Sequence, residues 1–158
     1  MKNKQVIIID YGMGNLASIK NALEHLGASV TISDEPDLIS KSSFSILPGV
    51  GSFKTAMNKI REKKIDEAIF DLKKKGNYLL GICLGMQILG KSSTEDGYTE
   101  GLGLVENEVI KFEKSNTNGN KIPHIGFNSV NFDSGNKLFK YLNNNLDFYF
   151  FHSYFMQT

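Results

Sequence analysis

The sequence contains one cysteine, almost no net charge and no long apolar run. A single cysteine excludes an internal disulfide framework and favours a reducing compartment. The balance of 18 basic against 17 acidic residues gives no electrostatic case for binding nucleic acid. No apolar stretch approaches the roughly 18 residues of a membrane-spanning helix, and the first residues lack the pattern of a signal peptide. We therefore expect a cytoplasmic protein that binds neither nucleic acid nor membranes.

The length and composition are those of one globular domain. The chain has 158 residues, of which 41% are apolar and 22% are charged. This composition excludes wholesale disorder, and the length supports one core of ordinary size. We expect a single domain over residues 1–158.

The first half of the chain alternates between apolar strand-length runs and helical patterns. Asn15 and Ser52 stand where they can cap the helices that follow them. The expected strands are Val6–Ile9, a stretch around Val30 and Ile32, Phe44–Leu47 and Tyr78–Ile82. This order predicts an α/β fold with a doubly wound, largely parallel sheet.

The second half has a different pattern. Residues 92–103 are polar and rich in glycine, and then three stretches resemble strands, with a short helix expected over Lys137–Leu142. The strand-like stretches are Leu104–Phe112, Ile122–Phe132 and Phe148–Phe155. This half predicts an antiparallel or mixed edge.

Cys83 lies in the pattern Gly81-Ile82-Cys83-Leu84-Gly85, between an expected strand and an expected helix. A lone cysteine is most often a small buried apolar residue. The G-x-nucleophile-x-G pattern, however, is that of a nucleophile elbow, a sharp turn that exposes the nucleophile at the carboxyl end of a strand. The N-terminus of the next helix would face the sulfur, and the N–H of Leu84 could bind an oxyanion. The pattern favours a catalytic thiol.

Pro48-Gly49-Val50-Gly51 is a glycine-rich turn after another expected parallel strand. Parallel strands end at the same edge of a sheet, so this turn should open beside Cys83 and could present N–H groups to a carbonyl oxygen. A plain strand-to-helix turn is the alternative. A phosphate-binding loop is disfavoured because no Gly-Lys-Ser/Thr follows.

Several segments together resemble the class I (triad-type) glutamine amidotransferases, which have a flavodoxin-like fold. Within that class the chain most resembles the glutaminase subunits of imidazole glycerol phosphate synthases. The segments occur in the family's order and span nearly the whole chain. They are Asp10–Asn15, Leu47–Gly51, Gly81–Gln87, Pro123–Asn128 and Phe148–Tyr154.

The resemblance implies that Cys83 attacks the side-chain amide of glutamine, forms a thioester and releases ammonia. Gly49 and Val50 would belong to an oxyanion strand that must reorient before its N–H faces the site, and Leu84 would provide the other oxyanion donor. The residues that match glutamine-binding positions are Gly51, Gln87, Ser153 and Tyr154.

The resemblance also implies a heterodimer with a (β/α)8 synthase (cyclase) subunit, in which the ammonia completes imidazole glycerol phosphate for histidine biosynthesis. Asn15 and Tyr149 match positions near that interface. No cofactor is implied. No histidines and carboxylates have metal-ligand spacing, so we expect no metal.

The sequence departs from the family at the general base. The family uses a late His-x-Glu pair, but the three histidines, His25, His124 and His152, all lack that context, and no glutamate follows Glu113. A cysteine without its base loses activation, as well as the acid that protonates the departing ammonia. We expect the domain to be incomplete at its C-terminus.

Other interpretations stay open. An amidotransferase serving another pathway, such as amidination of surface sugars, would carry the same motifs. An α/β-hydrolase with a cysteine nucleophile could use His124 or His152 as its base. We interpret His124 instead as a structural or interface residue, and His152 as a positioning residue. A shortened, inactive homologue could act as a binding module. A flavodoxin-like cofactor binder ranks last, because residues 10–15 lack G-x-G-x-x-G.

Overall fold

The computed structural model describes residues 4–117, 119, 121–133, 135–142 and 145–157. By its internal contacts the chain forms two compact units. The first comprises residues 1–110 with 156–158, and the second comprises residues 111–155. Among the described residues, no helix is long and apolar enough to cross a membrane.

The first unit contains a four-stranded parallel sheet of order β2-β1-β3-β4. The described residues of this unit also form five α-helices. The strands are β1 (Gln5–Ile9), β2 (Ser29–Ser33), β3 (Phe44–Leu47) and β4 (Tyr78–Gly81). The helices are α1 (Leu16–His25), α2 (Pro36–Lys41), α3 (Phe53–Glu62), α4 (Ile65–Lys74) and α5 (Leu84–Ile88).

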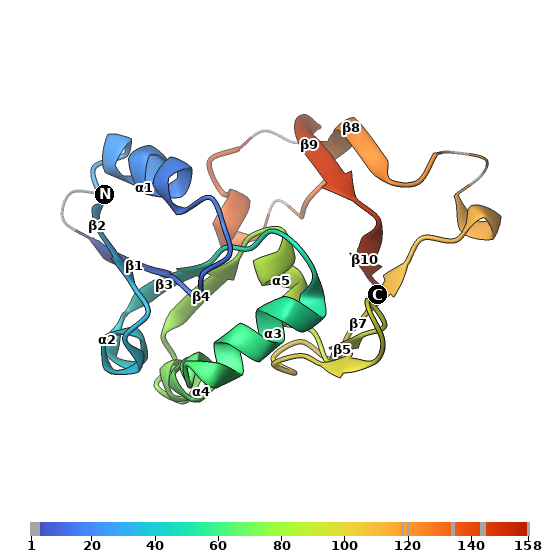
Figure 1. The fold of residues 1–158 in the computed structure, drawn as a ribbon. Coiled ribbons are helices and arrows are strands. Elements are labelled where there is room, and N and C mark those ends of the chain that lie inside the picture. Colours follow the sequence, from blue (N-terminus) through green and yellow to red (C-terminus); the bar gives the residue numbers. More distant parts are fainter. Residues whose placement is uncertain (1–3, 118, 120, 134, 143–144, 158) are drawn as a thin grey trace. The chain divides into compact units, whose positions relative to one another are not determined.

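The order of the strands places helices on both faces of the sheet. The chain moves from β1 outward to β2 and then returns across β1 to β3. Because crossovers between parallel strands are right-handed, this reversal puts the helix between β1 and β2 on one face and the helices of the later crossovers on the other. Figure 1 shows α1 on one face and α2, α3 and α4 on the other. The predicted doubly wound α/β fold is confirmed.

The core lies between the sheet and the face covered by α3 and α4. Leu47 in β3, Phe53 in α3 and Ile69 in α4 are fully buried. Ile8 in β1 is fully buried too, but it is the register partner of Ile46 and therefore faces the other side of the sheet from Leu47. In contrast, no residue of α1 is buried, and Leu26, directly after it, is 64% exposed. Leu26 falls at the C-cap of α1 and is therefore outside its packed turns. The expected caps are present: Asn15 Oδ1 accepts from Ser18 N at 3.3 Å, and Ser52 Oγ accepts from Thr55 N at 3.4 Å.

The strand expected over Leu104–Phe112 is shorter in the structure, where β7 covers only Glu108–Lys111. The residues before it are used differently. The N–H groups of Leu102, Leu104 and Val105 donate to the carbonyls of Ile88 and Leu89 at 2.9 Å. Carbonyls at a helix C-terminus lack partners within the helix, and here this loop supplies them.

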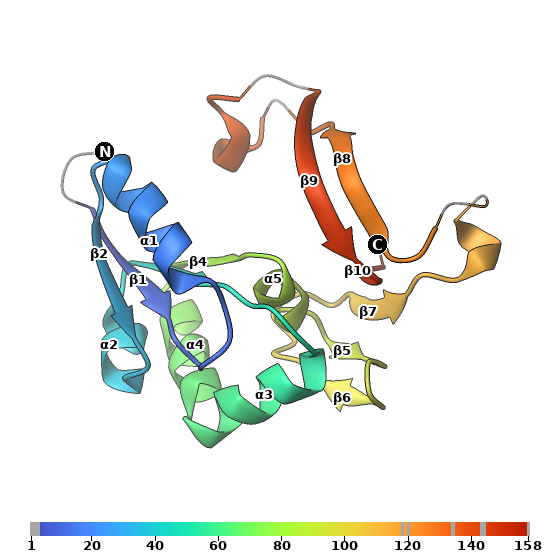
Figure 2. The ribbon, with the colours of Figure 1, turned by 45° about the horizontal axis from the view of Figure 1, so that its top comes forward.

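Short strands of the later chain form sheets of their own. β5 (Ser92–Ser93) pairs antiparallel with β6 (Thr99–Glu100) and parallel with β7. Further along, β8 (His124–Val130) and β9 (Leu146–His152) form an antiparallel hairpin, which Figure 2 shows as two strands side by side. The antiparallel strands expected in this half are therefore present.

Two elements of the second half differ in length from the prediction. The run Phe148–Phe155 is divided between β9 and β10 (Tyr154–Met156), because the carbonyl of Ser153 turns aside to accept from Phe112 N at 3.0 Å. The helix expected over Lys137–Leu142 is a single 3-10 turn, Lys137–Phe139, which Asn136 caps through Leu138 N.

Candidate active site

Cys83 occupies the sharp turn between β4 and α5. Its backbone has a φ of +55° and a ψ of −121°, a combination that side-chain-bearing residues rarely adopt. The thiol is free and exposed. A strained, exposed residue between a strand and a helix is the geometry of a nucleophile elbow. The local fold therefore presents the sulfur at the carboxyl edge of the parallel sheet.

The turn after β3 lies directly beside this elbow. Leu47 is paired with Gly81, and Ile82 N donates to the carbonyl of Leu47 at 3.0 Å, so β3 and β4 end side by side. A Cβ placed on Gly85 would overlap the carbonyl oxygen of Leu47. Glycine at this position is what lets α5 begin against the end of β3.

Leu84 N is the backbone N–H next to Cys83 that is open to a ligand. Gly85 N and Met86 N donate to the carbonyls of Ile82 and Cys83, both at 3.0 Å, whereas no acceptor for Leu84 N is found in the described part of the chain. Gly49, which is buried, packs against Leu84 and Gly85. Gly49 therefore lies beside Leu84, the residue that follows the exposed Cys83. The oxyanion roles expected for Gly49, Val50 and Leu84 stay predictions.

Glu95 supports the start of α3, a role that the sequence did not indicate. Its Oε2 accepts from Phe53 N at 2.7 Å, and Lys54 Nζ donates to the carbonyl of Asp96 at 3.3 Å. A carboxylate at a helix N-terminus is stabilised by the helix dipole. Glu95 thus fixes the start of α3, the helix into which the Pro48–Gly51 turn leads. The only sequence signal was an acidic residue in a polar loop.

The other expected residues of the first unit lie on the elements that frame Cys83. Gln87 lies on α5, and its N–H donates to the carbonyl of Cys83 at 3.2 Å. Gly51 is exposed with a φ of +103°, and a Cβ added to it would lie 2.7 Å from Met13 Cε. Asn15 follows the loop after β1 and caps α1. Gly51 and Asn15 both lie in loops after the carboxyl ends of parallel strands.

The remaining expected residues belong to the second unit, where the structure describes their own surroundings. Tyr149 on β9 is 59% exposed and makes an edge-to-face contact with Phe127 on β8, with ring centroids 5.2 Å apart. Ser153 accepts from Phe112, and Tyr154 provides the carbonyl that accepts from His152. The roles expected for Ser153, Tyr154 and Tyr149 stay predictions.

His124 and His152 form a cross-strand pair in the hairpin. His152 Nδ1 lies 2.8 Å from the carbonyl of Tyr154, which can only accept, so that nitrogen carries the proton. In the neutral ring, Nε2 of His152 is then the acceptor for Nδ1 of His124, 3.0 Å away. Both ring nitrogens of His152 are therefore engaged, which is consistent with its interpretation as a positioning residue.

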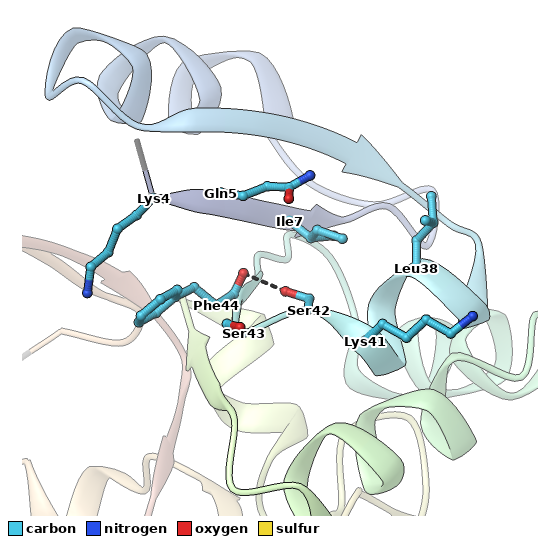
Figure 3. A pocket seen from close by; sticks show the side chains of 8 residues that line it. All are labelled: Lys4, Gln5, Ile7, Leu38, Lys41, Ser42, Ser43 and Phe44. Carbon is cyan, nitrogen blue, oxygen red and sulfur yellow. Dashed lines mark hydrogen bonds between the residues drawn. The ribbon is translucent and has the colours of Figure 1, made fainter. Parts of the chain in front are cut away.

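A separate hollow lies at the opposite, amino edge of the parallel sheet, where β1 and β3 begin (Figure 3). It is lined by Lys4, Gln5, Ile7, Leu38, Lys41, Ser42, Ser43 and Phe44. Ser42 Oγ donates to the carbonyl of Phe44 at 2.8 Å, and the Lys4 ammonium lies 4.4 Å from the centre of the Phe44 ring. No residue expected at the active site lines this hollow. Within the described residues, no cluster of three or more metal-binding side chains occurs.

Fold and site together define a family. A parallel α/β sheet with a strained cysteine at its carboxyl edge, beside a glycine-rich turn, agrees with the family model "Glutamine amidotransferase class-I", which matches residues 7–158. The chain belongs to the class-I glutamine amidotransferase family.

More specific relatives have one name in common. An "Imidazole glycerol phosphate synthase subunit HisH" of Bacillus velezensis is 42% identical over 151 residues, which are 94% of this chain and 71% of the relative. An "Imidazole glycerol phosphate synthase subunit HisH 2" of Methanococcus maripaludis is 46% identical over 152 residues, 96% of this chain and 74% of the relative.

Solved structures support the fold. A crystal structure of a glutamine amidotransferase matches with a TM-score of 0.71 at 20% identity and covers 97% of this chain and 74% of that one. The structure of a putative GMP synthase component from Thermoplasma acidophilum matches with a TM-score of 0.66 at 17% identity, covering 96% of this chain and 66% of that one. At these identities the likeness is one of fold.

Proposed function

We propose that this chain is the glutaminase subunit of an imidazole glycerol phosphate synthase. Cys83 in its strained elbow, beside a glycine-rich turn, is the observation that carries the chemistry. The two HisH relatives, which are 42% and 46% identical to this chain over most of its length, support the assignment to this synthase. We include residues 1–158 in one amidotransferase domain and expect the protein in the cytoplasm.

The proposed reaction begins with attack of Cys83 Sγ on the amide carbon of glutamine. A C–S bond forms, and the carbonyl oxygen becomes an oxyanion bound by Leu84 N–H and an N–H of the Gly49–Val50 turn. The C–N bond then breaks, and the nitrogen takes a proton and leaves as ammonia. Water hydrolyses the thioester to glutamate and restores the thiol. The acid and base of this family, a His-x-Glu pair, do not occur in residues 1–158.

Substrate and partner contacts complete the proposal. Gly51, Gln87, Ser153 and Tyr154 would hold glutamine. Asn15 and Tyr149 would lie near a (β/α)8 synthase subunit that receives the ammonia. Tyr149 supports such a contact because it belongs to an exposed apolar face of the hairpin, where Phe127 is 72% exposed and Phe151 is 65% exposed. Exposed aromatic clusters of this kind are typical of protein interfaces.

The experiment measures glutamate release by the protein, purified from its host, with and without its synthase subunit. We expect turnover that rises when the subunit is added and is lost in Cys83→Ala. A glutamine analogue with an electrophilic carbon in place of the amide should label Cys83 stoichiometrically. Tyr98→Phe, an exposed change in the first unit, is the matched control and should retain full turnover.

Each outcome separates the alternatives. If the analogue labels Cys83 but the ammonia reaches a different acceptor, the result would favour a paralogue that serves another pathway. Hydrolysis of simple esters without labelling would favour a cysteine hydrolase. A protein that binds its partner but neither labels nor hydrolyses glutamine would be a binding homologue, and the proposed function would be wrong.

A further inference from the structure

Tyr11 has a buried hydroxyl with no hydrogen-bond partner. It follows β1 in the loop at the carboxyl edge of the sheet, and its side chain is completely buried. Its hydroxyl is the one buried side-chain nitrogen or oxygen among the described residues for which no partner is found. Unpaired buried donors are rare because burial removes their water without replacing it. Such a group calls for an explanation.

The hydroxyl lies under the turn beside Cys83. A Cβ added to Gly49 would overlap the Tyr11 hydroxyl oxygen and would lie 2.9 Å from Gly85 N and 3.0 Å from Leu84 Cβ. The phenol, the turn and the first residues of α5 therefore meet around a single point. The absence of a side chain at Gly49 is what makes room for the hydroxyl.

The turn itself is anchored at its ends and free between them. The carbonyl of Leu47 accepts from Ile82 N at 3.0 Å, and the carbonyl of Ser52 accepts from Ala56 N at 3.1 Å. For the N–H and C=O groups of residues 49–51, in contrast, no hydrogen bond is found within the described chain. Val50, at the middle of the turn, is 55% exposed. Peptides held in this way can rotate without breaking a hydrogen bond.

The phenol remains a donor near a charged thiolate. Burial raises the pKa of Tyr11 well above its usual value, and a charge on Cys83 raises that pKa further. The hydroxyl therefore keeps its proton throughout the pH range in which an enzyme works.

We propose that Tyr11 is a positioning residue that holds the Gly49–Val50 peptide in its reactive orientation, by donating its hydroxyl proton to the carbonyl of Gly49. The N–H and C=O of a trans peptide point in opposite directions, so turning the Val50 N–H toward Cys83 turns the Gly49 carbonyl away. The unpaired hydroxyl lies against that residue. Because it gains a partner only after rotation, it shifts the population toward the rotated state. This inference rests on the proposed function.

Tyr11→Phe removes the hydroxyl and keeps the ring, so it separates this role from packing. We expect kcat for glutamate release in the complex to fall roughly three- to tenfold, as loss of one neutral hydrogen bond predicts. KM should change by less than about twofold, because the hydroxyl is proposed to orient the Gly49–Val50 peptide and not to bind glutamine. The melting temperature of the resting protein should stay equal or rise, since the variant no longer buries an unpaired donor. Tyr98→Phe should change none of the three quantities.

The outcomes distinguish this inference from the function on which it depends. If the wild-type complex releases glutamate and Tyr11→Phe releases it at the same rate, the inference is overturned and the function stands. The same holds if the variant loses activity only in proportion to a lower melting temperature, since that result indicates a packing role. If the wild-type complex releases no glutamate, both are overturned.

Discussion

At the scale of single residues, the candidate active site combines a strained backbone at Cys83 with an N–H group for which the described residues provide no acceptor. Cys83 adopts a φ of +55°. The N–H of the next residue, Leu84, has no acceptor within the described chain. Strained conformations of this kind cost about 1–3 kcal/mol and persist only where surrounding packing enforces them. That packing comes from α5 and from the ends of the neighbouring strands.

The strained backbone at Cys83 predicts that substitutions at this position differ in stability according to whether they relieve the positive φ. Cys83→Gly relieves the left-handed conformation, so we expect it to be more stable than Cys83→Ala by about 1 kcal/mol, after the entropy that glycine loses on folding. Both variants should lack glutaminase activity. Urea denaturation of the two proteins measures the difference. Equal stability of the two variants, or a less stable glycine variant, would show that the elbow is unstrained.

The sequence indicates features of the candidate site that local motifs record, and it does not indicate those that depend on distant partners. Cys83 and the Gly49 turn could be predicted because each lies in a glycine pattern that is readable within a few residues. Glu95 could not, because its partner Phe53 is 42 positions away. The buried hydroxyl of Tyr11 is likewise a product of tertiary packing. Propensity and spacing carry no record of such contacts.

At the scale of secondary-structure elements, α3 is the support of the proposed oxyanion turn. Glu95→Ala removes the acceptor of Phe53 N, and we expect a loss of about 1–2 kcal/mol in the free energy of unfolding together with lower glutaminase activity. Glu95→Gln should lose less, because its amide oxygen can still accept. The exposed Glu106→Ala serves as the control in denaturation and turnover assays. Equal effects of the alanine changes at 95 and 106 would contradict this account.

A second connection joins the end of β2 to the end of α3. Lys63 Nζ donates to Asp34 Oδ2 at 2.7 Å, and this hydrogen bond, together with the charge, lowers the pKa of Asp34 and raises that of Lys63. A lowered carboxyl pKa means that its contribution to stability is present above the ordinary value of 3.8 and is lost as the pH falls through the lower, folded value. The side chains are 38% and 51% exposed, so the contribution is small.

We therefore expect Asp34→Asn to lower the melting temperature slightly at neutral pH and low salt. The difference should shrink at high salt and vanish well below pH 3.8, where the wild-type carboxyl is also neutral. Lys63→Met should give a similar loss at neutral pH, and the double variant should lose little more than either single one. Fully additive losses would show that the two side chains do not interact.

The elements themselves were predicted best where the chain is buried on both sides. β1 and β3 are continuous apolar runs, and their bounds agree closely with those expected. The strand expected from Leu104 was too long because its first residues bond to the end of α5, and the aromatic run from Phe148 was divided at Ser153 by a bond to Phe112. Apolar content indicated strands in both places, but where each strand ends depends on tertiary hydrogen bonds.

At the scale of the whole molecule, the two units differ in how much they bury. The first contains a core that includes Ile8, Leu47, Phe53 and Ile69. In the second, none of the described residues with an assigned exposure is fully buried. Two-stranded hairpins have little stability of their own, and local stability follows apolar burial. The structure therefore predicts unequal opening of the two units.

Hydrogen exchange measures this difference and also tests the proposed partner. In the free protein, we expect amides of β8 and β9 to exchange faster than those of β1 and β3, because their opening exposes little additional apolar surface. Addition of the synthase subunit should slow exchange around Phe127 and Tyr149, if the exposed face of the hairpin docks there. β1 supplies an internal control, since its amides are already protected. Hairpin amides as slow as those of β1 in the free protein would contradict the difference in burial, and slowing confined to the first unit would remove Tyr149 from the proposed interface.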